Sequence, residues 1–422
     1  MNILVVGAGG VGASMASIAE TRGFFDSFVL ADISRERAEQ AVAELDDPGK
    51  FSAETVDAGD VKALIALITR TKADIVINAC DPRFNEPIFE ACFTAKCNYL
   101  DMAMNLSKPH PTNPYEEIGV TLGHAQLAAH EEWKERGLLA LVGMGVEPGL
   151  SDVFARYAAD NLFSEIDEIS VKDGGSLAVF DDEGNEIFAP SFSIWTTIEE
   201  CLNPPVIYER NRGWFTTEPF SEPEIFEFPE GIGSVECVNV EHEEVTMLPR
   251  HLNANRVTFK YGLGSEFIGV LKTLHKLGLD ATRPTRVRSN QGPVDVSPRD
   301  MVAAVLPDPA HIGPKMTGKT CAGVLVTGKD KDGKDRATYI YHVADNAQTM
   351  AEIEAQCEVA QTAFNPLIAL ELMARGEWKG AGVVGPEVFD PQPFLDLMAS
   401  STGYNQRWVA QERLPASPLR HP

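Results

Sequence analysis

The first twelve residues, MNILVVGAGGVG, constrain the fold more than any other part of the sequence. The apolar run Ile3–Val6 predicts a buried strand, and glycines follow it at once in the spacing G-x-G-x-x-G. Glycine at these places permits a tight turn, a close approach of the backbone to a pyrophosphate, and close packing of the next helix on the strand. The sequence therefore predicts a dinucleotide-binding loop made by Gly7, Gly9, Gly10, Val11 and Gly12.

Asp32 stands where a residue that binds the adenine ribose is expected. It follows the apolar run Phe28–Ala31 and lies 20 residues after Gly12. A carboxylate there accepts hydrogen bonds from both ribose hydroxyls and repels a 2′-phosphate, which favours NAD as the cofactor. Arg35 and Arg37 follow closely and either could contact a 2′-phosphate, so NADP is the alternative.

The first 150 residues alternate short apolar runs with longer amphipathic ones. Connections this short are typical of a parallel sheet with helices on both faces. We expect strands at Ile3–Val6, Phe28–Ala31, Thr55–Asp57, Ile75–Asn78, Tyr99–Asp101 and Leu138–Val142, and helices at Val11–Thr21, Arg35–Leu45, Asp60–Thr69, Glu86–Ala95 and Ala125–Arg136.

After residue 150 the sequence becomes richer in proline, aromatic and β-branched residues. This composition predicts an α+β domain that contains an antiparallel sheet. We expect strands at Glu165–Val171, Ser234–Val240 and Arg256–Tyr261, a hairpin formed by Thr320–Gly328 and Ala337–Val343, a helix at Phe267–Gly278 and a long helix from Met350.

Charge and cysteine content narrow the class of protein further. The chain has 36 Lys and Arg against 62 Asp and Glu, a net charge of −26. It would repel a phosphate backbone and an anionic membrane surface, so neither nucleic acid nor membrane is expected as a partner. The 7 cysteines form no C-x-x-C pair and no leader-like segment opens the chain, which predicts a cytoplasmic protein without disulfides. No zinc-type spacing of Cys and His occurs, so no metal is expected.

Polar residues follow the fourth and fifth predicted strands, where a parallel sheet forms its ligand crevice. Asn78, Ala79 and Cys80 are expected at the nicotinamide ribose, with Cys80 a small buried residue rather than a nucleophile. Asp101 is a candidate crevice carboxylate, and a cap or turn residue is the equally favoured alternative. The turn Gly143–Gly149 either brings backbone amides to the cofactor or acts as a hinge.

At this point the sequence resembles a known family. The glycine loop, Asn98–Asp101 and Gly145–Leu150 are similar to the saccharopine dehydrogenase family. The second half resembles its carboxynorspermidine dehydrogenase branch at His242–Glu244, Ala303–Gly313, Gly318–Thr320 and Gly376–Val383. The resemblance implies an oxidoreductase that acts on the CH–NH group of an amino-acid-derived amine: an aldehyde and an amine condense, and a hydride from NAD(P)H reduces the imine.

The same resemblance implies an α/β architecture. A Rossmann-type nucleotide domain would span residues 1–150 and be completed by about 357–422, and an α+β domain at 151–356 would bind substrate and form a homodimer. The family pattern places Gly145, Glu147 and Pro148 near the cofactor, and a substrate-lining loop at Asp173, Gly174 and Gly175.

Imine formation requires a group that moves protons. The candidates are Asp101, His242, Glu243 and Lys260, and a solvent-facing histidine is the alternative for His242. The carboxylate of an amino-acid substrate pairs well with arginine, for which Arg212, Arg250 and Arg256 are candidates.

Three other functions fit parts of the sequence. A lysine 6-dehydrogenase would release ammonia from a primary amine, and a dinucleotide sensor would bind the cofactor without turnover. Gly313–Thr320 also fits the P-loop pattern G-x-x-x-x-G-K-T. Two prolines shortly before it disfavour the strand that a P-loop needs, so we interpret this match as accidental.

Overall fold

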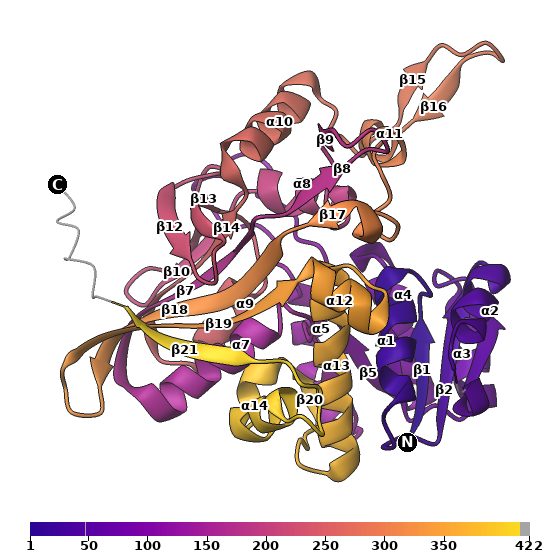
Figure 1. Cartoon of the computed structure of the whole chain (residues 1–422), viewed down its shortest axis with the longest axis horizontal. Helices are drawn as coiled ribbons and strands as arrows, with labels where there is room; N and C mark the ends of the chain where they lie inside the picture. Colours follow the sequence, from indigo (N-terminus) through magenta and orange to yellow (C-terminus); the bar gives the residue numbers. More distant parts are fainter. Residues whose placement is uncertain (47, 414–422) are drawn as a thin grey trace.

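The computed structural model describes residues 1–46 and 48–413, and two large sheets dominate this part of the chain (Figure 1). The first is a parallel sheet of seven strands in the order β20-β6-β5-β4-β1-β2-β3, so the predicted parallel sheet is confirmed. Its strands are β1 (Asn2–Val6), β2 (Ser27–Asp32), β3 (Phe51–Thr55), β4 (Ile75–Asn78), β5 (Asn98–Asp101), β6 (Leu139–Leu141) and β20 (Gly382–Val384).

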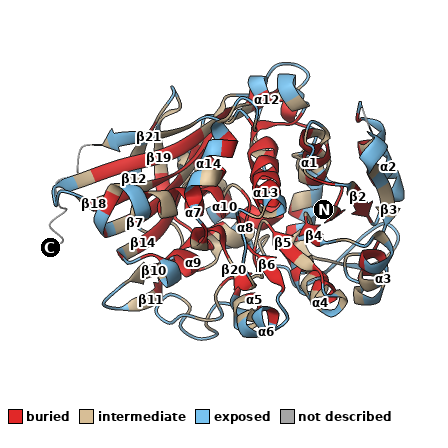
Figure 2. Ribbon diagram, turned by 90° about the horizontal axis from the view of Figure 1, so that it is seen from below, coloured by how far each residue is buried: buried red, intermediate tan, exposed pale blue. Residues whose placement is uncertain are grey.

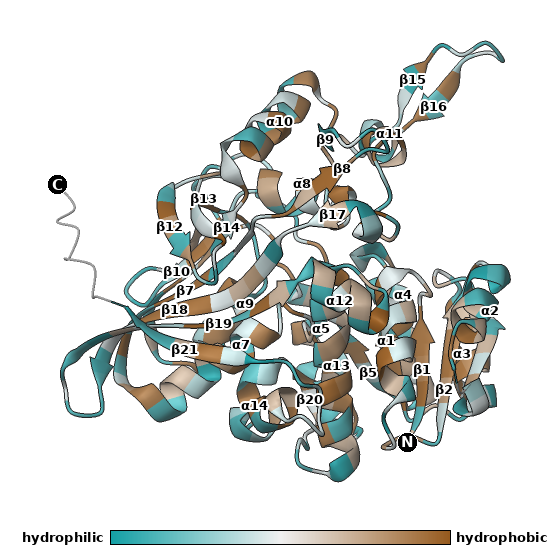
Figure 3. Cartoon of the chain, viewed as in Figure 1, coloured by the Kyte–Doolittle hydropathy of each residue, from teal (hydrophilic) through white to brown (hydrophobic). Residues whose placement is uncertain are grey.

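Helices cover both faces of this sheet, whose strands β1 and β2 are brown, and so apolar, in Figure 3. They are α1 (Gly10–Glu20), α2 (Arg35–Ala43), α3 (Val61–Thr71), α4 (Asn85–Ala95), α5 (His124–Ala128), α6 (His130–Glu135) and α13 (Cys357–Arg375). Helix α13 packs against α1 and is buried along most of its length, as Figure 2 shows. It therefore forms the core between the first sheet and the rest of the molecule.

The second sheet of the described residues has nine strands, seven of them in the order β11-β10-β14-β7-β18-β19-β21, with β13 joining β14 to β12. The antiparallel sheet that we expected is instead mixed, because β7 and β14 run parallel. Two strands separated by a long crossover can lie parallel. The strands are β7 (Phe163–Gly175), β10 (Val206–Glu209), β11 (Gly213–Thr216), β12 (Glu224–Phe228), β13 (Gly233–Asn239), β14 (Ala254–Gly262), β18 (Lys319–Asp330), β19 (Asp335–Asp345) and β21 (Trp408–Arg413).

Shorter elements surround the second sheet. The helices in this part of the chain are α7 (Leu150–Tyr157), a π-helix at Ala158–Leu162, α8 (Ile194–Leu202), α9 (Glu244–His251), α10 (Gly264–Leu277), α11 (Pro298–Val305), α12 (Asn346–Ile353) and α14 (Pro391–Ala399). Small strands lie at β8 (Ala178–Phe180), β9 (Glu186–Ile187) and β17 (Met316–Thr317). The 3-10 turns are at Gly313–Lys315 and Pro386–Val388 and, within the first sheet's domain, at Pro48–Lys50 and Pro82–Phe84. The hairpin β15 (Thr285–Val287) and β16 (Val294–Val296) projects from the body (Figure 1).

Three predicted elements differ from the structure. The third strand ends at Thr55, where we expected it to begin. The predicted helix Ala125–Arg136 is interrupted at Ala129, whose φ of −83° and ψ of 3° break the α-helical path. The long helix expected from Met350 is two helices, because Glu354 takes a left-handed conformation with φ 55° and ends α12.

The chain returns to the first sheet near its end, since β20 pairs with β6. Strand β21, which we assigned to the same returning segment, instead pairs with β19 in the second sheet. Residues 414–422 of that segment lie outside the described residues. None of the described helices is both long and apolar enough to cross a membrane.

The P-loop pattern does not form a P-loop. Lys319 begins the long strand β18, and a P-loop needs a helix after the Gly-Lys pair. The accidental match that we inferred from the prolines agrees with this geometry.

Candidate active site

The glycine loop between β1 and α1 is built to hold a dinucleotide. A Cβ on Gly7, where φ is 109°, would lie 2.6 Å from the carbonyl oxygen of Ala79, and one on Gly12 would lie 1.9 Å from that of Gly7. Gly9 caps α1 and has no atom within 4 Å of its Cβ position. Two glycines thus allow close packing and the third leaves open space at a helix N-terminus, which fits a pyrophosphate.

Asp32 ends β2 beside this loop, and it is buried. Its carboxylate accepts hydrogen bonds from the backbone N–H groups of Ala8 and Ser34, both at 2.9 Å. Arg37 lies 3.7 Å from Asp32, whereas Arg35 pairs with Glu39 in an exposed contact. The carboxylate therefore has a fixed orientation, and Arg37 is the nearer of the two arginines to the expected ribose position.

A cavity of about 290 Å³ lies between the glycine loop and the second sheet. We call it the inner cavity. The first sheet, its helices α1 and α13 and the turn after β6 contribute Val11, Asn78, Ala79, Cys80, Glu147, Pro148 and Glu358 to its wall; the second sheet and its neighbouring segments contribute Asp173, Thr197, Glu200, His242, Glu243 and Tyr261. Residues predicted for the cofactor and for catalysis thus meet at one cavity.

The inner cavity is acidic. Burial raises the pKa of Asp173 and that of Glu200 to about 8, and the pKa of Glu358 to about 7. Burial likewise raises the pKa of Glu147, whose Oε1 accepts a 3.1 Å hydrogen bond from the Gly323 N–H while its buried Oε2 has no partner. No lysine or arginine lines the cavity among the described residues. A cation bound among these carboxyl groups would lower their pKa values and favour their ionised forms.

His242 is the exception in this acidic wall. Its ring stacks on Phe259 with 3.8 Å between centroids, and its Nδ1 lies 2.5 Å from Oε2 of Glu244. Burial alone would lower the pKa of His242, but Glu244, Glu243 and Glu200 outweigh it and raise that pKa to about 10. The ring is therefore protonated at neutral pH, and Nε2 has no hydrogen bond to any described residue.

Glu243 and Cys80, two other predicted residues of this wall, are held by the backbone. Glu243 accepts a 2.9 Å hydrogen bond from the Met104 N–H, and burial raises its pKa even though His242 opposes the effect. Burial raises the pKa of the Cys80 thiol to about 12, so it stays neutral. Asn78 accepts from the Cys80 N–H at 3.0 Å and so shapes the strand end.

Asp101 lies behind the cavity wall rather than in it. Its two oxygens accept hydrogen bonds from the Gly143 N–H at 2.7 Å and from Nε2 of Gln126 at 2.6 Å. Burial raises its pKa to about 7. The residue fastens the turn that follows β6 and carries Gly145, Glu147 and Pro148, so we assign it a positioning role.

Strand alternation separates Lys260 from the cavity. Tyr261 lines the cavity, and its neighbour Lys260 extends from the opposite face of β14, where Nζ lies 3.1 Å from Oε2 of Glu224. The same alternation places Asp173 in the cavity and Lys172 behind it. Lys260 is thus not brought to the site that we predicted for it.

The three predicted arginines also lie away from the inner cavity. Arg212 covers the ring of Phe215, Arg250 covers that of Trp214, and Arg256 pairs with Glu209 and Glu222. Each already has a partner. Gly174 and Gly175 line a neighbouring cavity that Asp173 shares.

Sequence reasoning missed Tyr261, Thr197, Glu200 and Glu358. Thr197 and Glu200 lie on α8, and Glu358 lies in the first turn of α13. Nothing in their local sequence distinguishes them from ordinary helix residues. The register of β14 against β7 would have identified Tyr261, because it pairs with Asp173.

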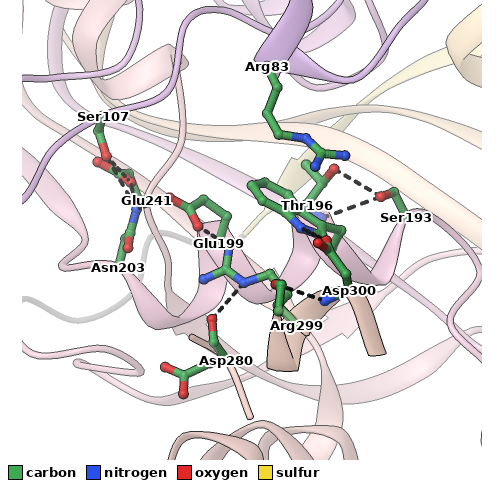
Figure 4. A network of polar contacts seen from close by, with 12 residues as sticks. Arg83, Ser107, Ser193, Thr196, Glu199, Asn203, Glu241, Asp280, Arg299 and Asp300 are labelled. Atoms are coloured by element: carbon green, nitrogen blue, oxygen red, sulfur yellow. Dashed lines mark hydrogen bonds and ion pairs between the residues drawn. The ribbon is translucent and has the colours of Figure 1, made fainter. Parts of the chain in front are cut away.

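A polar network joins the two walls beside this cavity (Figure 4). Arg83, which follows the strand end at β4, lies over the ring of Trp195 on α8 at 4.4 Å, and Arg299 of α11 lies over the same ring at 4.7 Å. The indole N–H of Trp195 donates to Asp300 at 3.0 Å, and Arg299 pairs with Glu199. These contacts fix α8 and its cavity residues against the first sheet.

Comparisons with known proteins agree with this geometry. The family model for the saccharopine dehydrogenase NADP binding domain matches residues 3–141, and the model for the saccharopine dehydrogenase C-terminal domain matches 145–404. Carboxynorspermidine synthases of Vibrio alginolyticus and Vibrio cholerae are 33% and 32% identical to the chain; the alignments cover 100% and 99% of this chain and 99% of each relative. Carboxyaminopropylagmatine dehydrogenase of Synechocystis is 28% identical over 93% of this chain and 94% of its own.

A solved structure shares the fold. Apo saccharopine dehydrogenase (L-Glu forming) of Saccharomyces cerevisiae superposes with a TM-score of 0.63 at 13% identity, covering 98% of this chain and 100% of its own. The two family models together span nearly the whole chain, and the glycine loop is shaped for the nicotinamide dinucleotide that the first model names. The chain therefore belongs to the saccharopine dehydrogenase family, a family of NAD(P)-dependent oxidoreductases that act on amines and imines.

Proposed function

We propose that this protein reduces the imine formed between an amine and an amino-acid-derived aldehyde to a secondary amine that carries a carboxyl group. The names of its full-length relatives denote such carboxylated amines. One observation carries the proposal: the inner cavity joins the strand ends beside the glycine loop to a wall of carboxyl groups that contains one protonated histidine.

The cofactor fits between the glycine loop and the inner cavity, where Val11, Ala79, Cys80 and Pro148 would hold the nicotinamide. The bound dinucleotide supplies the hydride. Holding the imine carbon close to it accounts for much of the rate. The network around Trp195 fixes α8, which carries Thr197 and Glu200, and so helps to orient the substrate.

The cavity residues divide the proton transfers. An amine arrives as an ammonium ion and must lose a proton before it attacks the aldehyde; the ionised forms of Glu200 and Asp173, each with a pKa of about 8, can accept it. The carbinolamine then loses water, and protonated His242 donates the proton from Nε2 that lets hydroxide leave as water. Glu244 keeps the ring oriented through Nδ1.

A cofactor-linked assay tests the reaction. Purified protein is given reduced cofactor with an amine, with an aldehyde-bearing amino acid, or with both, and the loss of the reduced-nicotinamide absorbance is followed. We expect oxidation only when both substrates are present, and a secondary amine as the product. Release of ammonia in the reverse direction would instead indicate an oxidative deaminase of the lysine 6-dehydrogenase type.

For the cofactor we propose NAD, on the strength of the buried Asp32 carboxylate at the end of β2. The matching family model is described by NADP, and Arg37 beside Asp32 could pair with a 2′-phosphate. Asp32→Ala is expected to weaken NAD more than NADP and so reverse the preference. An unchanged preference for NAD would refute the assignment to Asp32.

We also propose a homodimer in the cytoplasm. Helices α10 and α11 expose Leu277, Met301 and Val305, 66%, 47% and 71% accessible, on one side of the second sheet's domain. All 7 cysteines are free, which suits a reducing compartment. Light scattering of wild type and of Val305→Asp tests the interface; a monomeric wild type would refute it.

A further inference from the structure

The hairpin of β15 and β16 is a separate two-stranded sheet that projects from the body (Figure 1). We call residues 281–297, which contain it, the arm. Its two strands pair with each other and with no other described strand, and residues 281–291 are all exposed. A two-stranded hairpin by itself is at best marginally stable in water. The arm therefore has the form of an element that packs against a further surface.

The base of the arm is fixed by α11. Arg299 donates its backbone N–H to the carbonyl oxygen of Ala281 at 3.1 Å and its Nε–H to that of Asp280 at 2.7 Å. The same side chain pairs with Glu199 and lies over the ring of Trp195 (Figure 4). Because these contacts are buried in the body, the fold determines the direction in which the arm projects.

One face of the arm is apolar and uncovered. Strand alternation places the cross-strand partners Val287 and Val294 on one face, and the next pair, Arg286 and Asp295, on the other. The two valines are 38% and 42% exposed. In the sequence the arm lies between α10 and α11, the two helices whose exposed apolar residues we assigned to the dimer interface. The uncovered face thus extends that surface.

The arm carries the opposite charge to the chain as a whole. It contains Arg283, Arg286 and Arg288 against one carboxylate, Asp295, whereas the whole chain has a net charge of −26. Among the described residues only Asp295 pairs with any of these arginines, in an exposed contact with Arg286 at 2.7 Å. A basic arm is attracted to an acidic surface, and a second copy of this chain offers one.

The most acidic short segment near the arm is the turn between β8 and β9. Residues 181–186, which we call the acidic turn, contain four carboxylates in six residues. Asp182 pairs with Lys315, whereas Glu183 and Glu186 are exposed and form no ion pair with a described residue. The acidic turn therefore has two carboxylates free to pair with arginines of another chain.

The acidic turn lies on the same side of the domain as the two helices that flank the arm. Phe188, just after β9, packs on Phe267 of α10 with 5.2 Å between ring centroids. The segment that follows lines a cavity together with Ala303 and Ala304 of α11. In a two-fold dimer both halves of each contact belong to one surface of the chain. This side of the domain presents both halves, a basic arm and an acidic turn.

We propose that the arm docks on the acidic turn of a second copy of this chain, and that the arm of the second copy docks in return. The inference rests on the homodimer proposed above and assigns its contacts. Arg286 and Arg288 pair with the partner subunit's Glu183 and the partner subunit's Glu186, and the apolar face of the arm leaves water at the same contact.

The apolar face is tested by sedimentation equilibrium, which gives the Kd of the dimer. Val287→Asp combined with Val294→Asp should raise that Kd at least about tenfold, since each buried valine is lost twice in a two-fold dimer. Val120→Asp is the matched control, because Val120 is 43% exposed and forms a β-bridge with Lys108, in the segment between β5 and α5. It should leave the Kd unchanged.

The charges are tested by reversal and rescue. Arg286→Glu combined with Arg288→Glu should raise the Kd about tenfold at low salt and less at high salt, where the attraction is screened. Adding Glu183→Lys and Glu186→Lys to the same chain reverses both halves of each contact and should restore most of the affinity. Arg70→Glu, at an exposed arginine of α3, is the control and should have no effect. No rescue by the second pair of substitutions would overturn the docking of the arm on the acidic turn.

The outcomes separate the arm from the homodimer. A wild type that is monomeric at every concentration would overturn both. A wild-type dimer whose Kd is unchanged in the arm variants, or is raised equally by Val120→Asp, would overturn the arm and leave the homodimer in place. The proposed reaction enters neither result, because the cofactor-linked assay measures it separately.

Discussion

Two groups of charges lie on opposite faces of β7 and β14, and they are organised in opposite ways. On one face Lys172, Lys260 and Arg256 pair with Glu222 and Glu224; we call these five residues the paired cluster. On the other face the inner cavity gathers carboxyl groups with a single protonated histidine. Consecutive residues of the same strands belong to different groups, since side chains alternate between faces.

The pKa shifts record this difference. Burial alone would raise the pKa of Glu224, but Lys172 and Lys260 outweigh it and lower that pKa. In the cavity His242 is the one cation among the described lining residues, and burial outweighs its effect and raises the pKa of Asp173 and that of Glu200 to about 8. A group of charges whose counter-ions all belong to the protein stabilises the fold. A group with too few counter-ions in the protein favours the binding of a charged ligand. The predictions below test this distinction.

The largest expected effect concerns activity. His242→Gln should lower kcat by a factor on the order of 10²–10⁴, because it removes the proton donor of the cavity. Lys260→Met should leave kcat within about threefold, since Lys260 belongs to the paired cluster. Steady-state kinetics measures kcat of both variants. If Lys260→Met lowers kcat as much as His242→Gln does, the two faces do not differ in function.

Breaking the paired cluster should instead cost stability. Glu224→Gln leaves the charge of Lys172, which is 2% exposed, without its main partner, so we expect the free energy of unfolding to fall by about 2–3 kcal/mol. Lys172→Met removes the buried charge itself and should cost less. Urea unfolding of the two variants gives the comparison. If Lys172→Met proves the more damaging change, the cluster is not held by charge pairing.

The pH dependence of stability should follow the buried carboxyl groups in and behind the cavity wall. Asp101, Asp173, Glu200 and Glu358 have raised pKa values, so the folded state retains protons that the unfolded chain releases. Their contribution is fully present below the unfolded pKa of about 4 and is lost as pH rises through 7 to 8, a fall on the order of a few kcal/mol. Urea unfolding at pH 5.5, 7 and 8.5 measures it. Stability that rises over this range would contradict the assignment.

The smallest expected effect separates two adjacent residues of α8. Glu200→Gln removes a buried carboxylate for which the cost of burial outweighs the attraction of His242, and it should raise the free energy of unfolding by about 1 kcal/mol at pH 8.5 but not at pH 5.5. Glu199→Gln removes the partner of Arg299 and should lower it by about 1 kcal/mol. If the free energy of unfolding changes in the same direction in both variants, the buried charge of Glu200 does not destabilise the fold.

The sequence predicts those parts of the site that depend on local spacing. The glycine loop, Asp32 and the strand end Asn78–Cys80 follow from short patterns within one βαβ succession. The substrate side of the site does not follow from short patterns, because long crossovers determine which strands pair in a mixed sheet. Lys260 and Tyr261 are neighbours in sequence, and only the pairing of β14 with β7 decides which of them lines the cavity.

The central claim, that the unpaired carboxyl groups form a cation site, can be measured by proton release. A straight-chain diamine is titrated calorimetrically into the cofactor-bound protein at pH 7.5 in two buffers of different ionisation enthalpy. Because binding of a cation lowers the pKa of nearby carboxyl groups, we predict that protons are released on binding and that Glu200→Gln releases fewer. Binding without proton release, or no binding at all, would contradict the account.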